Sequence, residues 1–113
     1  MSKKTQTAEM PKTTYDRIAD MCDRLKETLQ SKNADYGDSA FKPPLLRPNM
    51  DAGCAILVRM SDKINRIITL EQYHRVAERV DFDMMKQTES LADTYLDLAG
   101  YALLRLIELE KER

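Results

Sequence analysis

Apolar residues return every three or four positions in three long stretches of the chain, and this spacing predicts three amphipathic helices. The first is predicted to begin at Thr13 or Thr14 as the N-cap and to end at Gly37. Its apolar stripe comprises Tyr15, Ile18, Cys22, Leu25 and Leu29. The second covers residues 54–73. Its predicted apolar face comprises Leu57, Met60, Ile64, Ile67 and Ile68.

The third helix is predicted to begin between Asp83 and Ser90 and to run almost to the end of the chain, where residues 108–113 have a solvated composition. Residues 36–53, before the second helix, hold three prolines and two glycines, so no helix can continue through them. The tyrosine, phenylalanine and two leucines of this segment predict an ordered loop packed on the helices. Residues 74–83 are weakly patterned and leave room for a short helix.

These elements predict an all-α fold, a bundle of three long helices with room for a short one in the connector. The third helix is apolar nearly all round and offers more apolar surface than the other two can cover, which predicts a homodimer or homotetramer. Residues 1–12 are polar and lack periodicity, so they are expected to form a flexible N-terminal tail. Residues 13–113 are expected to form a single helical domain.

The composition limits the classes of partner that the protein is expected to bind. The chain has 113 residues, 33% of them charged, and a formal net charge of -1, so no excess of cations exists to bind duplex nucleic acid. Its two cysteines lie far apart without a CxxC motif, which indicates reduced thiols in a cytoplasmic protein. No signal-like or membrane-length apolar run occurs, so no membrane association is expected.

Three acids stand out in the apolar third helix. Glu89, Asp93 and Asp97 lie at four-residue steps and, with Gly100, fall within an arc of roughly 80° on a helix. Burying unpaired carboxylates costs several kcal/mol, so these acids are predicted to face a metal ion or cations. Carboxylates without histidine or cysteine suit Mg²⁺ or Mn²⁺. The predicted metal ligands are Asp62, Glu89, Asp93 and Asp97.

The second helix carries a basic stripe that could receive phosphate. Arg59, Lys63 and Arg66 share one side of this helix with Asp62. Arginine would give bidentate contacts to phosphate oxygens and lysine a point charge. Together with the acids, this stripe favours metal-assisted phosphoanhydride chemistry.

Two structural alternatives also explain the acids. The sequence "SLAD" at residues 90–93 matches a capping box, so Glu89 and Asp93 could favour a helix N-terminus, although Asp97 lies deeper in the helix. The acids of the third helix and the cations of the second could equally form an ion-pair network that binds no ligand.

Three sequence blocks resemble a known family. "KNADYGDS" (residues 32–39), "RMSDKINRI" (59–67) and "ESLADTYLDLAGYALL" (89–104) resemble, in order, the phage and bacterial nucleotide modification associated domain 1 family. This resemblance implies a nucleotide as the substrate class and, for a phage-encoded protein, the host cytoplasm as its location.

A more distant similarity is to MazG-like all-α nucleoside triphosphate pyrophosphatases, oligomeric bundles that use clustered acids and Mg²⁺. The sequence "DTYLDLAGYA" (residues 93–102) is similar to their acidic motif helix. Those enzymes place ExxE on one helix and ExxD on the next. Here Arg59 and Asp62 occupy the first spacing, and Ser90 and Asp93 the second, so fewer ligands are present.

The leading hypothesis is therefore a Mg²⁺-dependent nucleoside triphosphate pyrophosphohydrolase with Glu89 and Asp93 as catalytic residues. Tyr36 or Phe41 would stack on the base. The predicted substrate-binding residues are Lys32, Asn33, Tyr36, Asp38, Arg59, Lys63 and Arg66. The alternative hypothesis is a protein that binds and sequesters a nucleotide or cyclic nucleotide without converting it. A helical interaction module is the third possibility.

Overall fold

Three long helices account for most of the described chain. The computed structural model describes residues 10–77 and 84–111, with side chains described for 10–72 and 90–111. In chain order the elements are α1 (Thr14–Tyr36), the 3-10 helix η1 (Ser39–Phe41), α2 (Ala52–Ala77) and α3 (Met84–Lys111). These ranges contain no strand, so the all-α prediction is confirmed for them. Residues 74–77 extend α2, and the rest of the predicted connector and most of the N-terminal tail lie outside the described residues.

Local sequence signals determine both ends of α1. Thr13 is the N-cap, and its Oγ1 accepts a hydrogen bond from the Asp16 amide at 3.1 Å while the Asp16 carboxylate accepts one from the Thr13 amide at 3.3 Å. This reciprocal capping box satisfies two amides that the helix leaves without partners. Gly37 ends the helix in the left-handed region at φ 57°, and its amide donates to the Asn33 carbonyl at 2.9 Å. A residue without Cβ adopts that conformation at little cost.

The loop after η1 packs less than its composition predicted. Leu45 and Leu46 are 96% and 93% exposed, so the expectation that both pack on the helices was wrong. The Arg47 amide donates to the Pro44 carbonyl at 3.1 Å, which makes Leu45 and Leu46 the central residues of a turn pointing outward. Phe41 is half-buried, and the Lys111 ammonium lies 3.8 Å from the centre of its ring.

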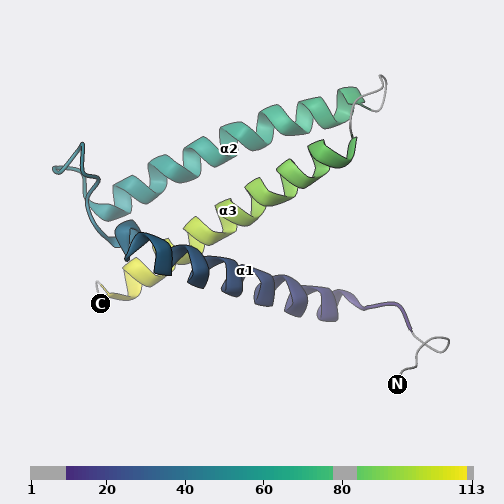
Figure 1. The fold of residues 1–113 in the computed structure, drawn as a ribbon, viewed down its shortest axis with the longest axis horizontal. Coiled ribbons are helices and arrows are strands. Elements are labelled where there is room, and N and C mark those ends of the chain that lie inside the picture. The colour runs from purple at the N-terminus through teal and green to yellow at the C-terminus, as the bar shows by residue number, and fades with distance from the viewer. Residues whose placement is uncertain (1–9, 78–83, 112–113) are drawn as a thin grey trace.

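The α2 and α3 helices run antiparallel, side by side (Figure 1). The described apolar core is small and comes from α2 alone: Ala52, Ala55, Ile56 and Ile67. From α3, Thr94 is buried at 2% exposure. Of the apolar face predicted for α2, only Ile67 is buried, while Leu57, Ile64 and Ile68 are 46–55% exposed. That part of the prediction was wrong, because α2 directs its basic stripe toward α3 instead.

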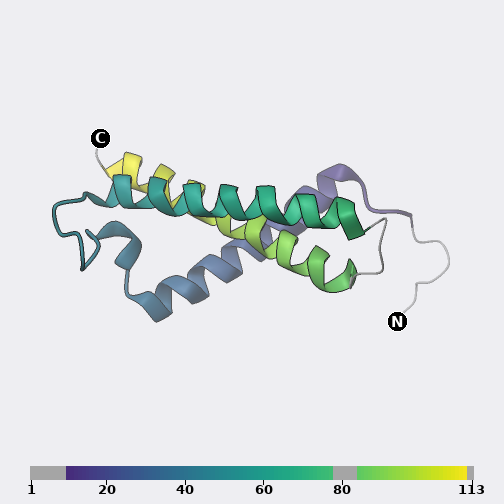
Figure 2. The same ribbon diagram turned by 90° about the horizontal axis from the view of Figure 1, so that it is seen from above.

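The α1 helix crosses α3 in the C-terminal half of α3, and its first half extends away from the other two helices (Figures 1 and 2). No residue of α1 is buried. The radius of gyration is 18.3 Å, whereas a compact domain of this length has about 13 Å. The single chain is therefore open and elongated. Within the described ranges, no helix combines the length and apolar character needed to cross a bilayer.

Candidate functional site

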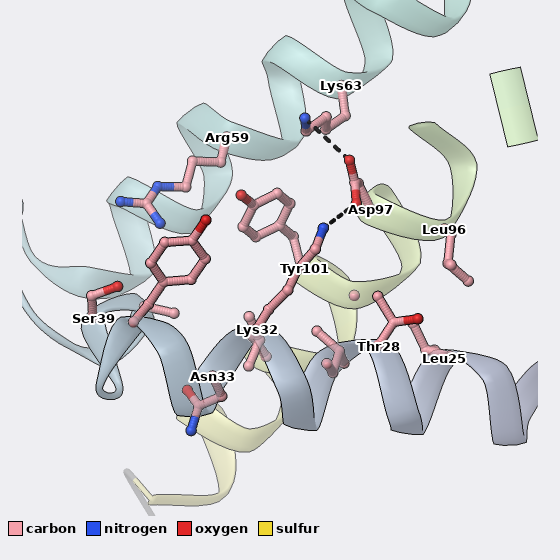
Figure 3. Close-up of a pocket in the computed structure, with 15 residues that line it drawn as sticks. Leu25, Thr28, Lys32, Asn33, Ser39, Arg59, Lys63, Leu96, Asp97 and Tyr101 are labelled. Carbon is pink, nitrogen blue, oxygen red and sulfur yellow. Dashed lines mark hydrogen bonds and ion pairs between the residues drawn. The ribbon is translucent and has the colours of Figure 1, made fainter. Parts of the chain in front are cut away.

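A cavity of about 350 Å³ lies where α1, α2 and α3 meet (Figure 3). Lys32 from α1 and Arg59 and Lys63 from α2 line it, and Asp97 from α3 is its one carboxylate among the described residues. The cavity therefore carries an excess of positive charge. Its volume falls within the range of small-molecule sites, about 300–1,000 Å³.

Asp97 lies between two lysines from different helices. Its Oδ1 is 2.9 Å from the Lys32 ammonium and its Oδ2 is 3.3 Å from the Lys63 ammonium (Figure 3). The carboxylate thus joins α1 to α3 and α2 to α3. This is the charge pairing that the sequence predicted for an inward-facing acid of α3, and it matches the ion-pair alternative at this one residue.

The ion pairs change how these groups titrate. Partial burial raises the pKa of the Asp97 carboxyl, but the hydrogen bonds and charges of Lys32 and Lys63 outweigh burial and hold that pKa below its usual value. The hydrogen bond to Asp97 raises the pKa of the Lys32 ammonium above its usual value. The Asp97 carboxyl and the Lys32 ammonium are therefore both charged at neutral pH.

Arg59 is the cation of the cavity that remains available. Its side chain is half-buried and lines the cavity from α2 (Figure 3). Among the described residues it has no hydrogen-bond or ion-pair partner, in contrast to Lys32 and Lys63. A partly desolvated guanidinium with five free donors is suited to bind an oxyanion.

Aromatic and amide groups surround the cations. Tyr36 and Tyr101 line the cavity, as does Asn33. The Asn33 amide nitrogen donates to the Asp38 carboxylate at 2.7 Å, which orients its carbonyl oxygen as a remaining acceptor. Asp38 has a positive φ of 63°, directly after the left-handed Gly37, so the end of α1 turns sharply beside the cavity.

Arg66 lies outside this cavity, contrary to the prediction that it shares a phosphate site with Arg59 and Lys63. Its Nε donates to Thr94 Oγ1 at 3.0 Å and its NH2 to Ser90 Oγ at 2.9 Å. Two hydroxyls of α3, rather than a carboxylate, therefore hold the guanidinium. The capping-box interpretation of Ser90 was also wrong, because α3 begins at Met84 and Ser90 lies inside the helix.

The predicted metal ligands do not converge in the described chain. The Asp93 side chain is 72% exposed and lies 3.8 Å from Arg24, and Asp62 is exposed. The Glu89 side chain lies outside the described residues. Among the described side chains, no three carboxylate, histidine or cysteine groups form a metal cluster. One carboxylate held by two lysines does not fit a Mg²⁺ site, because Mg²⁺ requires several oxygen ligands in octahedral geometry.

The structure brings together five of the seven predicted substrate-binding residues: Lys32, Asn33, Tyr36, Arg59 and Lys63. Asp38 contacts the cavity through Asn33, and Arg66 does not line it. Sequence reasoning did not single out Tyr101, which lines the cavity. Its position four residues after Asp97, and so on the same side of α3, was the available signal.

Comparisons with family models, curated proteins and solved structures each found no match to this chain.

Proposed function

We propose that the cavity between α1, α2 and α3 binds a nucleotide through its phosphates. The observation that carries this proposal is the convergence of three separate sequence blocks on one cavity. Residues 32–39, 59–67 and 89–104 contribute all but four of its lining residues, the exceptions being Leu25, Thr28, Leu29 and Ala40. These are also the blocks that resemble the nucleotide modification associated domain 1 family, which supports a nucleotide as the ligand class.

The phosphate would bind to Arg59 first, because this guanidinium has no partner among the described residues. Lys63 lies one turn further along α2 and is 29% exposed, so a second phosphate could share its ammonium with Asp97. Both cations belong to α2, whose antiparallel packing on α3 fixes their position. A lysine ammonium has three donors and can serve both anions.

The base would lie toward the end of α1. Tyr36 and Tyr101 offer aromatic rings on which a base can stack, and stacking tolerates any base because each has a π face. Base selection would depend on Asn33, whose carbonyl oxygen can accept from an amino group. Cations are therefore expected to bind the phosphates of the ligand, and aromatic rings to stack on its base.

Phosphoanhydride hydrolysis is the second candidate function. The observation that favours it is Asp97, a carboxylate in the same cavity as the proposed phosphate cations. The described residues of one chain do not supply a metal site, so we assign no catalytic step to them. A homodimer or homotetramer in the cytoplasm is proposed as the setting of either function.

The test is calorimetric titration with nucleoside mono-, di- and triphosphates, with and without Mg²⁺, followed by analysis of the recovered ligand. We expect binding without Mg²⁺ and an intact ligand. Arg59→Gln should weaken binding about 10- to 100-fold, because a hydrogen bond to a charged group contributes about 1.5–3 kcal/mol. The control Arg47→Gln makes the same change in the exposed loop and should leave the affinity unchanged. Binding by no nucleotide would overturn the proposal.

Asp97→Asn separates the two candidate functions. If the protein only binds, removal of the carboxylate that competes for Lys32 and Lys63 should leave the affinity equal or higher. If it hydrolyses the ligand, pyrophosphate release by the wild type should disappear in this variant. Asp93→Asn provides a comparison, because Asp93 was the predicted catalytic residue but its side chain is largely exposed.

A further inference from the structure

The charges that line the cavity do not cancel. Within the described residues, the charged lining side chains are three cations and one carboxylate: Lys32, Arg59, Lys63 and Asp97. They leave a net charge of +2. The two lysines share the single negative charge of Asp97, with their ammonium groups 2.9 and 3.3 Å from its two oxygens. The Arg59 guanidinium has no partner among the described residues, so a ligand that completes this cavity brings about two negative charges.

We propose that the cavity selects a nucleoside monophosphate, whose single terminal phosphate carries two negative charges. This inference rests on the proposed function and specifies the ligand class of the same site. A phosphate monoester has a charge of about -1.5 to -2 at pH 7, because its second pKa is about 6. That charge matches the net charge of the described lining residues. Each further phosphate would add negative charge for which this lining offers no additional cation.

The spacing of the two cations on α2 suits one phosphate. Arg59 and Lys63 are four residues apart in this helix, which places their Cβ atoms about 5–6 Å from each other. Both side chains line the cavity, so two oxygens of one phosphate can receive donors from both. The Ser39 hydroxyl also lines the cavity and has no hydrogen-bond partner among the described residues. It can donate to a third oxygen without adding charge.

The size of the cavity and its carboxylate both disfavour longer phosphate chains. The volume of about 350 Å³ lies at the lower end of the range of small-molecule sites, about 300–1,000 Å³. A base stacked on Tyr36 or Tyr101 shares this volume with the ribose and the phosphates. A second or third phosphate would therefore extend beyond the cations or approach the Asp97 carboxylate, which repels it. That side chain is only 25% exposed, so water screens the repulsion less than at an open surface.

Calorimetric titration with three matched ligands, in EDTA to exclude Mg²⁺, tests the inference at pH 7.5. Each of the four common nucleosides is used as its 5′-monophosphate, as the methyl ester of that monophosphate and as its 5′-triphosphate. The methyl ester keeps the base, the ribose and the phosphorus but carries one negative charge. We expect it to bind about 10- to 100-fold more weakly than the monophosphate, because it loses a charge-assisted interaction. The triphosphate should bind at least 10-fold more weakly than the monophosphate.

Variants of the lining show whether its charge causes the preference. Lys63→Gln lowers the net charge to +1 and should reduce the preference for the monophosphate over its methyl ester to less than threefold. Lys26→Gln makes the same change on α1 outside this cavity and should keep the wild-type preference. Asp97→Asn raises the net charge to +3 and should reduce the preference for the monophosphate over the triphosphate at least threefold. Each preference is a ratio measured on one protein, so a uniform loss of affinity does not imitate these results.

The outcomes separate this inference from the proposed function. If a triphosphate or a methyl ester binds as tightly as the monophosphate, the inference is wrong while the proposed function stands. A preference that stays unchanged in Lys63→Gln would also overturn the inference, because the charge of the lining would then not cause it. Should Lys63→Gln lose its helical circular dichroism, the Asp97→Asn ratio decides in the same way. Binding by no nucleotide would overturn the proposed function and this inference with it.

Discussion

The two sides of α3 have the reverse of the usual distribution, with polar residues facing the other helices and apolar residues facing water. The side that faces α1 and α2 presents Asp97 to two lysines and Thr94 to a guanidinium, while the side that faces water carries Ala99 and Leu106. In an isolated helical protein, apolar residues line the core and charged residues cover the surface. Within this chain, polar groups join the helices beside a small apolar core.

The two sides of α3 therefore differ in what would stabilise them. Charged groups in a partly buried seam cost free energy unless they are paired, and Arg59 among them has no partner in the described residues. Exposed apolar residues lower stability and solubility unless another surface covers them. The anionic ligand proposed for the cavity would supply a partner for Arg59 on the inner side.

The largest effect on the free energy of unfolding is expected from the small apolar core of α2. Ile56, 1% exposed, is the most buried large side chain described, and Ile56→Ala should lower the free energy of unfolding by about 2–5 kcal/mol. Ile64→Ala, at 46% exposure about 80° around α2 from Ile56, should cost less than about 1 kcal/mol. Urea denaturation measures both. An equal cost for the two variants would mean that Ile64 is covered as fully as Ile56.

A smaller loss of stability is expected when the guanidinium of Arg66 loses one hydrogen-bond acceptor. Thr94→Val removes the hydroxyl that accepts from Arg66 Nε, in a site 2% exposed, and should cost about 1–3 kcal/mol. Thr69→Val is the matched control. The Thr94 hydroxyl donates to the Ser90 carbonyl at 2.8 Å, and the Thr69 hydroxyl likewise donates to the Asn65 carbonyl at 3.2 Å, but no described group donates to the Thr69 hydroxyl. Equal stability of the two variants in thermal unfolding would show that the Arg66 contact contributes nothing.

The smallest effect is expected from Asp97 and depends on pH. Because the pKa of Asp97 is lowered in the folded protein, its stabilisation is present above the unfolded pKa of about 3.9 and is lost as pH falls through the folded value. The raised pKa of Lys32 stabilises below about 10.4 and is lost as pH rises through the folded value. Asp97→Asn should therefore cost most on a plateau between roughly pH 5 and 9.5.

On that plateau Asp97→Asn should lower the free energy of unfolding by about 1 kcal/mol or less, because the Lys32 side chain is 51% exposed and water screens the pair. Thermal unfolding of wild type and Asp97→Asn across this pH range gives the difference. Asp93→Asn is the control, with a 3.8 Å ion pair and a side chain 72% exposed, and should have almost no effect. A difference that increases below pH 4 would contradict the assigned pKa direction.

Local signals in the sequence were enough to predict the helices. Thr13 and Asp16 form the capping box, and Gly37 supplies the left-handed residue that ends α1, because these interactions join residues close in sequence. The ends of α2 and α3 were predicted within a few residues for the same reason.

The predicted face of each helix was less accurate, because packing depends on residues far apart in the sequence. Periodicity grouped Leu57, Ile64 and Ile68 on one side of α2, but it could not show that the basic side would turn toward α3. The predictions that Asp93 and Asp97 lie in the third helix were both correct. Only Asp97 meets two cations, because the crossing of α1 brings Lys32 to its level on α3.

Gly100 has a consequence for the width of the cavity. A Cβ added there would lie 3.0 Å from Leu29 Cδ2, so α1 rests against α3 only as closely as this missing methyl group permits. Because α1 carries Lys32 and Asn33 into the cavity, the small size of Gly100 sets the distance between α1 and α3 there. A larger residue at this position would wedge the two helices apart and so change which ligand sizes the protein admits.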